Sequence, residues 1–132
     1  MNNEKILIID NELQYAEYSA SILKPLGYEI FFADNGVKGL LLVNKIKYDL
    51  IMINIFMHPI SGFEICRKIK EKNNIPVIFF ISEQKDLKKI AECYKSGGQD
   101  YIVKLFAPEE LAARVDCQLK VKNFDERLCA RE

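Results

Sequence analysis

The sequence predicts an α/β domain in which a five-stranded parallel sheet is doubly wound, with helices covering both of its faces. Short apolar runs alternate along the chain with amphipathic segments. Two of these runs, residues 6–9 and 77–81, are continuously apolar. Continuous apolar runs are typical of parallel strands that are buried on both faces. Strands are therefore expected near residues 5–9, 28–33, 50–54, 76–81 and 100–103, with a helix after each.

Three of the segments that follow the strands carry apolar residues at helical spacing. The residues are Leu13, Ala16, Ala20 and Leu23 in the first segment, Leu87, Ile90, Ala91 and Tyr94 in the fourth, and Leu111, Val115 and Leu119 in the fifth. Boundary signals agree with this assignment. Gly27 is placed to close the first helix, Ser61 with Glu64 forms a capping box for the third, and Pro108 opens the fifth.

Length and composition suit one domain without disulfides or metal, because 132 residues that are 49% hydrophobic can bury an ordinary core. Nineteen basic residues balance nineteen acidic ones, so no net charge favours direct contact with nucleic acid or with an anionic membrane. No apolar run approaches the roughly 20 residues that span a bilayer, and we expect a cytoplasmic protein. Residues 4–121 are predicted to form the domain, and residues 122–132 a helical extension or a linker to a further domain.

The four cysteines are widely separated, with no Cys-x-x-Cys pair. This spacing argues against a zinc site and against a disulfide scaffold, so reduced thiols are expected. Cys93 and Cys117 fall on the fourth and fifth predicted helices. We interpret both as small buried apolar residues rather than as redox centres.

Polar side chains lie at the ends of four predicted strands. Asp10 and Asn11 follow the first strand, Asn54 ends the third, Ser82 ends the fourth and Lys104 follows the fifth. In a parallel sheet with right-handed crossovers the carboxyl ends of the strands share one edge, where a crevice forms. These side chains are therefore expected to converge on a single site.

Each of these residues also has a purely structural interpretation. Asn11 could cap the first helix, with Gln14 three residues later completing a capping box. Ser82 could cap the fourth helix, and Tyr101 could simply pack at a strand edge. Their joint spacing favours a common site over separate structural roles.

Five segments carry a resemblance to a known family: IIDNE at 8–12, DLIMIN at 49–54, SGFE at 61–64, FFIS at 79–82 and GGQDYIVK at 97–104. In their order and spacing they resemble the receiver domain of two-component response regulators, over about residues 4–121. The resemblance implies a flavodoxin-like (βα)5 fold with strand order 2-1-3-4-5. It also implies a signalling module rather than an enzyme.

The resemblance implies a role for each site residue. In the family, an aspartate at the position of Asn54 accepts a phosphoryl group from a histidine kinase, and acidic residues at the positions of Asp10 and Asn11 hold Mg²⁺. The hydroxyl that contacts the phosphoryl group falls on Ser82, the lysine that pairs with it on Lys104, and the aromatic switch on Tyr101. The Mg²⁺ site would comprise positions Asp10, Asn11, Asn54 and Phe56.

The chain departs from this pattern at the chemistry itself. Asn54 cannot form an acyl phosphate, because that anhydride needs a carboxylate nucleophile. Amides at positions 11 and 54 remove two anionic ligands that Mg²⁺ prefers, so we expect Mg²⁺ to be absent or weakly bound and no cofactor to be present. Lys104 is expected to fill the pocket, either pairing with Asp10 or donating to the Asn54 side-chain oxygen.

Three neighbouring positions also differ from the family. His58 replaces a proline, and we interpret it as a solvent-exposed loop residue rather than a phosphoacceptor or metal ligand. Leu105 replaces the proline after Lys104, so the bond before it is expected to be trans, since a cis bond would cost about 2.5–4 kcal/mol. Glu83 follows Ser82 and would narrow the phosphate entrance and repel the anion.

These features favour a pseudo-receiver that acts through protein contacts on the face of the fourth helix, fifth strand and fifth helix. That face carries Lys88, Asp100, Arg114 and Asp116 as charges, with Tyr94 and Tyr101 as anchors. The partner could be an attached output domain, a separate protein such as a histidine kinase, or another copy of the chain.

Two alternatives are weighed against this function. The chain could be a phosphorylatable receiver whose aspartate was replaced in the laboratory, or whose phosphate goes elsewhere, but differences at Asn11, His58, Glu83 and Leu105 favour natural change. A flavin or nucleotide binder would need a glycine- or hydroxyl-rich loop after the first strand. The sequence IDNELQ offers none.

Overall fold

A computed structural model describes residues 4–72, 76–83, 85–104 and 106–131, with side chains up to Glu126. All five strands in these ranges are parallel, in the order β2-β1-β3-β4-β5, which confirms the predicted flavodoxin-like fold. They are β1 (Lys5–Ile9), β2 (Glu29–Ala33), β3 (Leu50–Asn54), β4 (Val77–Ser82) and β5 (Asp100–Val103). Each strand lies within one residue of its predicted bounds.

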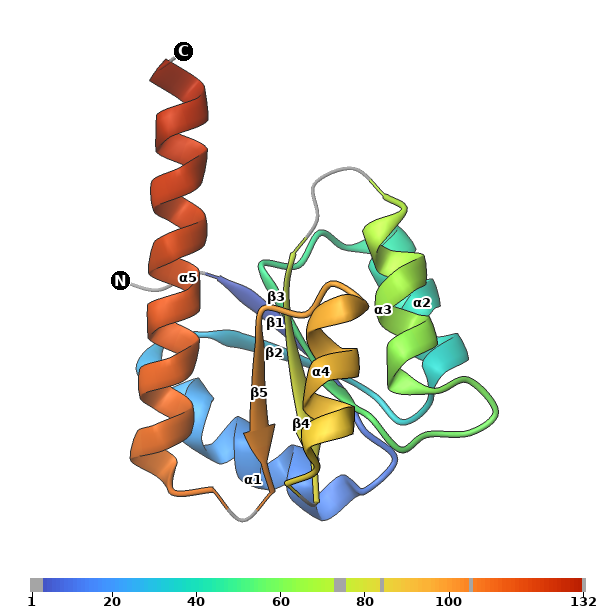
Figure 1. Ribbon diagram of the computed structural model, residues 1–132. Coiled ribbons are helices and arrows are strands. Elements are labelled where there is room, and N and C mark those ends of the chain that lie inside the picture. The colour runs from blue at the N-terminus through green and yellow to red at the C-terminus, as the bar shows by residue number, and fades with distance from the viewer. Residues whose placement is uncertain (1–3, 73–75, 84, 105, 132) are drawn as a thin grey trace.

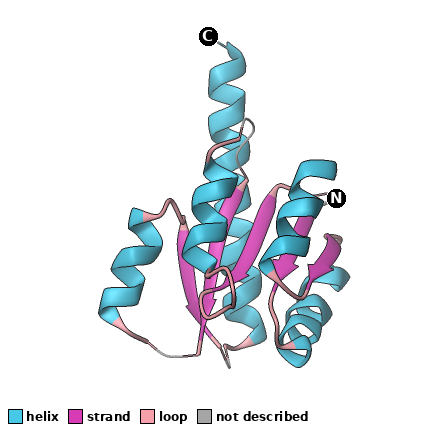
Figure 2. Ribbon diagram, turned by 90° about the vertical axis from the view of Figure 1, so that its right-hand side faces the viewer, coloured by secondary structure: helices cyan, strands magenta, loops and turns pink. Residues whose placement is uncertain are grey.

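Helices cover both faces of the sheet (Figures 1 and 2). They are α1 (Leu13–Leu23), α2 (Gly36–Lys45), α3 (Gly62–Lys70), α4 (Leu87–Lys95) and α5 (Pro108–Arg131), and a short 3-10 helix spans Lys24–Leu26. One apolar core joins the sheet to α1 and α5, and the other joins it to α2, α3 and α4. Because alternate residues of β1, β3 and β4 point into the two cores, these strands need the continuous apolar runs seen in the sequence.

Side-chain caps fix where several helices begin. The Ser61 hydroxyl accepts a hydrogen bond from the Glu64 amide, 3.3 Å, as the predicted capping box requires. Asn35 caps α2 in the same way, and Asp86 caps α4 by accepting from two backbone amides. Gly27 has φ of 100° and ends the 3-10 turn rather than α1 itself, because a left-handed residue is needed there.

Two of the predicted apolar stripes differ from the structure. On α4, Leu87 is 77% exposed and Tyr94 is 51% exposed, so the stripe that they were expected to bury lies largely in solvent. Leu13 at the start of α1 is also exposed, whereas the rest of that stripe is buried. The predicted stripe on α5 is confirmed, since all three of its residues are buried. Periodicity identified these helices correctly but not how far each one packs on the sheet.

The interpretation of the cysteines is confirmed for Cys93 and wrong for Cys117. Cys93 is fully buried, and burial raises the pKa of its thiol to about 12, which opposes a redox role at neutral pH. Cys117 is an exposed free thiol on α5. The helix turns this residue away from the sheet, because its buried neighbours Val115 and Leu119 lie on the opposite side.

Helix α5 is continuous from Pro108 to Arg131, so the stretch after residue 121 is helical and extends beyond the sheet (Figure 1). The division into a domain at 4–121 and an extension at 122–132 stays a prediction. Within the described ranges, no helix combines the length and the hydropathy that crossing a bilayer requires.

Gly62 provides a test of the packing that supports the end of β3. A Cβ at this position would lie 2.5 Å from the Asn54 carbonyl oxygen and 2.9 Å from the Ile55 Cα, both of which are backbone atoms. We expect Gly62→Ala to lower the free energy of unfolding by about 1–3 kcal/mol, because the strand end must shift. Chemical denaturation measures this change.

Gly36→Ala is a matched control, because Gly36 also opens a helix directly after its capping residue. There the new methyl would meet side-chain atoms and no backbone atom: Ile65 Cδ1 at 3.0 Å, Ile65 Cγ1 at 3.2 Å and Ile60 Cβ at 3.3 Å. Equal losses in the two variants would contradict the argument from backbone contact.

Candidate functional site

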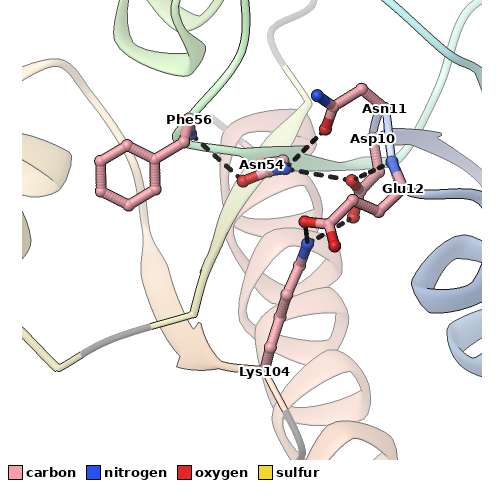
Figure 3. A network of polar contacts seen from close by, with 6 residues as sticks. All are labelled: Asp10, Asn11, Glu12, Asn54, Phe56 and Lys104. Atoms are coloured by element: carbon pink, nitrogen blue, oxygen red, sulfur yellow. Dashed lines mark hydrogen bonds and ion pairs between the residues drawn. The ribbon is translucent and has the colours of Figure 1, made fainter.

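The predicted site residues converge at the carboxyl edge of the sheet (Figure 3). Asp10 directly follows β1, Asn54 ends β3, Ser82 ends β4 and Lys104 directly follows β5. All four are buried, with at most 4% of their surface exposed. The expected grouping of polar side chains from four strands is therefore present in the structure.

The side-chain amide of Asn54 forms hydrogen bonds at both of its ends. Its nitrogen donates to Asp10 Oδ1, 3.0 Å, and to Asn11 Oδ1, 3.1 Å. Its oxygen accepts from the Phe56 backbone amide, 3.2 Å. This orientation is dictated by chemistry, because the Asp10 carboxylate can only accept and the Phe56 N–H can only donate.

The structure contradicts the capping interpretations of Asn11 and Ser82, and the interpretation of Tyr101 as an anchor on the surface. Asn11 does not cap α1, because the capping position is Glu12, which forms no side-chain cap bond, and the Asn11 oxygen binds Asn54 instead. Ser82 does not cap α4, because Asp86 does. Tyr101 is buried in the core shared with α2, α3 and α4, so it is not an exposed anchor.

Lys104 occupies the centre of the pocket with its side chain 1% exposed. Its ammonium lies 3.4 Å from Asp10 Oδ2 and 2.6 Å from Glu12 Oε1. It also lies 4.2 Å from the centroid of the Tyr15 ring, a cation–π contact. The expected pairing of Lys104 with Asp10 is confirmed, and Glu12 is a second carboxylate partner that was not predicted. The Asn54 oxygen, the alternative partner, accepts from Phe56 instead.

Sequence reasoning missed Glu12 and Tyr15 as members of the site. The signal for Glu12 was its place at the start of α1, at the same edge of the sheet as Asp10. The signal for Tyr15 was its position on the first turn of that helix. Both lie at the start of α1, whereas the predicted site residues lie at strand ends or directly after them.

The charged groups of Lys104, Glu12 and Glu83 influence one another. The hydrogen bond from Lys104 lowers the pKa of the Glu12 carboxyl below its usual value. A hydrogen bond with Glu12 and repulsion between the two carboxylates raise the pKa of Glu83, which is exposed at the surface. The Glu83 carboxyl therefore lies next to that of Glu12, at the exposed side of the pocket.

The donor atoms of the pocket do not fit Mg²⁺. Mg²⁺ requires several oxygen ligands, preferably anionic, in octahedral geometry. Here the Asn54 NH₂ group points at the same Asp10 and Asn11 oxygens that a cation would need, and the ammonium of Lys104 lies beside the other Asp10 oxygen. No group of three or more His, Cys, Asp or Glu side chains suited to a metal occurs in the part of the chain that the structure describes.

Two loops lie beside the pocket, one around His58 and the other after Lys104. His58 is exposed, as expected, and its peptide bond to Pro59 is cis. The expected trans bond between Lys104 and Leu105 lies outside the described residues. Phe56, next to His58, is 48% exposed, and the Lys89 ammonium of α4 lies 5.6 Å from its ring centroid.

The face formed by α4, β5 and α5 has charges that pair with each other. Arg114 Nη1 donates to Asp100 Oδ1, 2.9 Å, and to the Tyr101 carbonyl oxygen, 3.3 Å. A hollow of about 350 Å³ lies between these elements, with Tyr94 at its side. Asp100 is thus a partly buried salt-bridge partner of Arg114 rather than a free surface charge. Lys88 is exposed.

Comparisons with known proteins agree with this geometry. Residues 6–116 match the family described as the response regulator receiver domain. The transcriptional regulatory protein YrkP of Bacillus subtilis is 36% identical over 88% of this chain and 49% of its own length. ResD of the same organism, also a transcriptional regulatory protein, is 32% identical over 90% of this chain and 49% of its own length.

The solved structure of the Francisella response regulator 1452 receiver domain superposes with a TM-score of 0.83. It is 27% identical in sequence and covers 91% of this chain and 99% of that one. The chain spans about half the length of the two curated relatives and nearly all of this isolated receiver domain. It therefore belongs to the response regulator receiver domain family, whose members act in two-component signalling.

Proposed function

We propose that this receiver domain is a pseudo-receiver, which takes no phosphoryl group at Asn54 and signals by binding other proteins. One observation carries the proposal: the Asn54 amide donates to Asp10 and Asn11 where the family has a reactive carboxylate and a metal. The Asn54 amide and the Lys104 ammonium thereby face both oxygens of Asp10: Oδ1 accepts from Asn54, and Oδ2, which accepts no hydrogen bond, lies 3.4 Å from the ammonium. These two groups take the place of a cation beside Asp10.

The chemistry of phosphoryl transfer supports this proposal at two further points. A phosphoryl group arriving at the pocket needs cations to stabilise its developing charge. The Lys104 ammonium is already engaged by Asp10 and Glu12, and the exposed Glu83 carboxyl lies next to that of Glu12. We propose that Mg²⁺ is absent or weakly bound for the same reason, and that the domain carries out no enzymatic step of its own.

The surface of α4, β5 and α5 is the proposed site of protein contact. Leu87 and Tyr94 are exposed apolar side chains on α4, and Tyr94 lines the hollow beside Arg114. Exposed apolar groups next to paired charges are common in protein interfaces. The matched relatives are transcriptional regulatory proteins of about twice this length, which supports an attached output domain as the partner.

Treatment with a small-molecule phosphodonor and Mg²⁺, followed by intact mass measurement, tests the central step. We expect the wild-type chain to keep its mass, because an amide cannot form the anhydride. The double variant Asn11→Asp/Asn54→Asp restores three carboxylates and is expected to gain one phosphoryl group. A stoichiometric adduct on the wild-type chain would contradict the proposal, and peptide mapping would locate an alternative acceptor.

Thermal unfolding with and without Mg²⁺ tests the proposed loss of the metal site. The wild-type Tm should not depend on millimolar Mg²⁺ beyond the effect of NaCl at equal ionic strength. The Asn11→Asp/Asn54→Asp variant should be less stable without metal, because its carboxylates repel each other, and should gain Tm on adding Mg²⁺. A saturable rise in the wild-type Tm is the result that would refute the proposed absence of metal.

The Glu12–Lys104 pair predicts a stability that depends on pH. Folding lowers the pKa of Glu12 below 4.5, so the pair stabilises the fold above about pH 4.5, and this stabilisation is lost as pH falls through the lowered pKa. The difference in unfolding free energy between wild type and Glu12→Gln should be present at pH 7 and shrink in acid. Glu17→Gln, at an exposed position on the same helix, controls for the loss of a charge. A difference that stays constant down to pH 3 would exclude the pair as its source.

A further inference from the structure

Helix α5 carries a second apolar stripe, distinct from the one that packs on the sheet. Cys117 is exposed, Val121 is 52% exposed and Phe124 is 60% exposed. Leu111, Val115 and Leu119 are buried against the sheet. At 3.6 residues per turn the exposed set lies on nearly the opposite side of the helix from the buried set. The exposed stripe therefore lies on the side of α5 that does not pack on the sheet, and Val121 borders a hollow beside Pro76 and Gln99.

The spacing of this stripe is that of a coiled-coil seam. Cys117, Val121 and Phe124 are separated by four and then three residues, and Leu128 continues the same spacing in the sequence. Alternating steps of three and four keep apolar residues on the line where two helices wind around each other. Positions 117 and 124 then correspond to d of the heptad, and positions 121 and 128 to a.

The shape of the molecule leaves room for a second helix along this line. α5 is 24 residues long, about 36 Å, and its C-terminal half extends past the end of the sheet (Figures 1 and 2). In that half the Lys122 ammonium lies 3.9 Å from Asp49 Oδ1, and the Asn123 side-chain nitrogen donates to Glu4 Oε2, 3.5 Å. Neither contact involves the exposed stripe.

We propose that the exposed stripe of α5 binds the same stripe of a second copy of this chain, forming a parallel two-helix coiled coil. The charges beside the stripe specify both the partner and the direction. Lys120 occupies position g and Asp125 the following position e, and parallel strands place each g residue against the next e residue of the other helix. Two copies therefore form two Lys120–Asp125 pairs, one on each side of the seam.

The antiparallel arrangement is disfavoured by the same charges. It would bring g positions together across the seam and so place Lys120 against position 127, which is an arginine. Within one chain Lys120 pairs with Asp116, 2.9 Å, but both side chains are well exposed. An exposed pair of this kind is weak, so Lys120 can exchange it for the partner's carboxylate.

Parallel pairing places the two domains on opposite outer sides of the seam. This separation follows from the buried stripe, which holds each domain on the side of α5 that faces away from the exposed stripe. On α5 the interface continues along the side of the helix that carries Glu110 and Arg114, which line the hollow of the α4, β5 and α5 face. The interface does not depend on whether Asn54 accepts phosphate.

Sedimentation equilibrium of the full 132-residue chain over a range of concentrations tests the dimer and its register. Because only about two heptads contribute, we expect a weak dimer with a dissociation constant on the order of micromolar to tens of micromolar. Lys120→Glu and Asp125→Lys should each weaken it by roughly three- to tenfold, since each replaces two attractive pairs by repulsive ones. The double variant Lys120→Glu/Asp125→Lys should restore wild-type affinity.

Phe124→Glu should abolish the dimer, and Glu17→Lys on α1 is the matched control for a charge reversal away from the seam. All of these positions are exposed, and thermal unfolding confirms that each variant is folded. Mild oxidation with copper phenanthroline should join the two Cys117 thiols across the seam, with the oxidant taking up two electrons and two protons released. Cys117→Ser removes the crosslink, which a non-reducing gel shows.

Two results would overturn the proposal. One is a chain that stays monomeric at the highest concentration measured. The other is a dimer whose affinity is unchanged by Phe124→Glu and by both single charge reversals, which would locate its interface on a different face. The parallel register would also be contradicted if Cys117 crosslinks but Lys120→Glu and Asp125→Lys do not weaken the dimer, or their double variant does not restore it.

Discussion

The hydrogen bonds of the Asn54 amide are the constraint on which the rest of this site depends. An amide at the end of β3 offers a donor toward Asp10 and Asn11 and an acceptor toward the Phe56 backbone, and each end finds its match. An aspartate in the same place would offer only acceptors and would face the Asp10 carboxylate without a donor or cation between them. The Asn54 amide thus donates hydrogen bonds to the oxygens that, in the family, bind a metal ion.

The same substitution changes what Lys104 does. With no anion to receive, its ammonium rests between Asp10 and Glu12 and against the Tyr15 ring, so its charge is compensated within the protein. A buried ammonium without such partners would be strongly destabilising. The lysine therefore ties the loop after β5 to the start of α1. These ion pairs connect the β5 side of the crevice to its α1 side.

Much of the fold could be predicted because local and long-range signals agreed. Short apolar runs located every strand to within one residue, and the capping box at Ser61 marked the start of α3. Periodicity misjudged α4, because Leu87 and Tyr94 have helical spacing but no partner surface to pack on. Burial is a tertiary property, and spacing alone cannot tell an apolar face that packs inside from one that faces solvent.

The sequence predicted which residues at the strand ends form the site, but it did not predict which side chains pair with each other. Asp10, Asn54, Ser82 and Lys104 follow from topology, whereas the role of Glu12 depends on how α1 begins. The direction of the Asn54 amide also needed the positions of both its neighbours. A crystal structure grown in Mg²⁺ tests the account most directly. We expect Asn54 Nδ2 to stay bonded to Asp10 and Asn11, and Lys104 to stay paired with Asp10 and Glu12. A metal ion coordinated by Asp10 and the Asn54 oxygen would contradict the account.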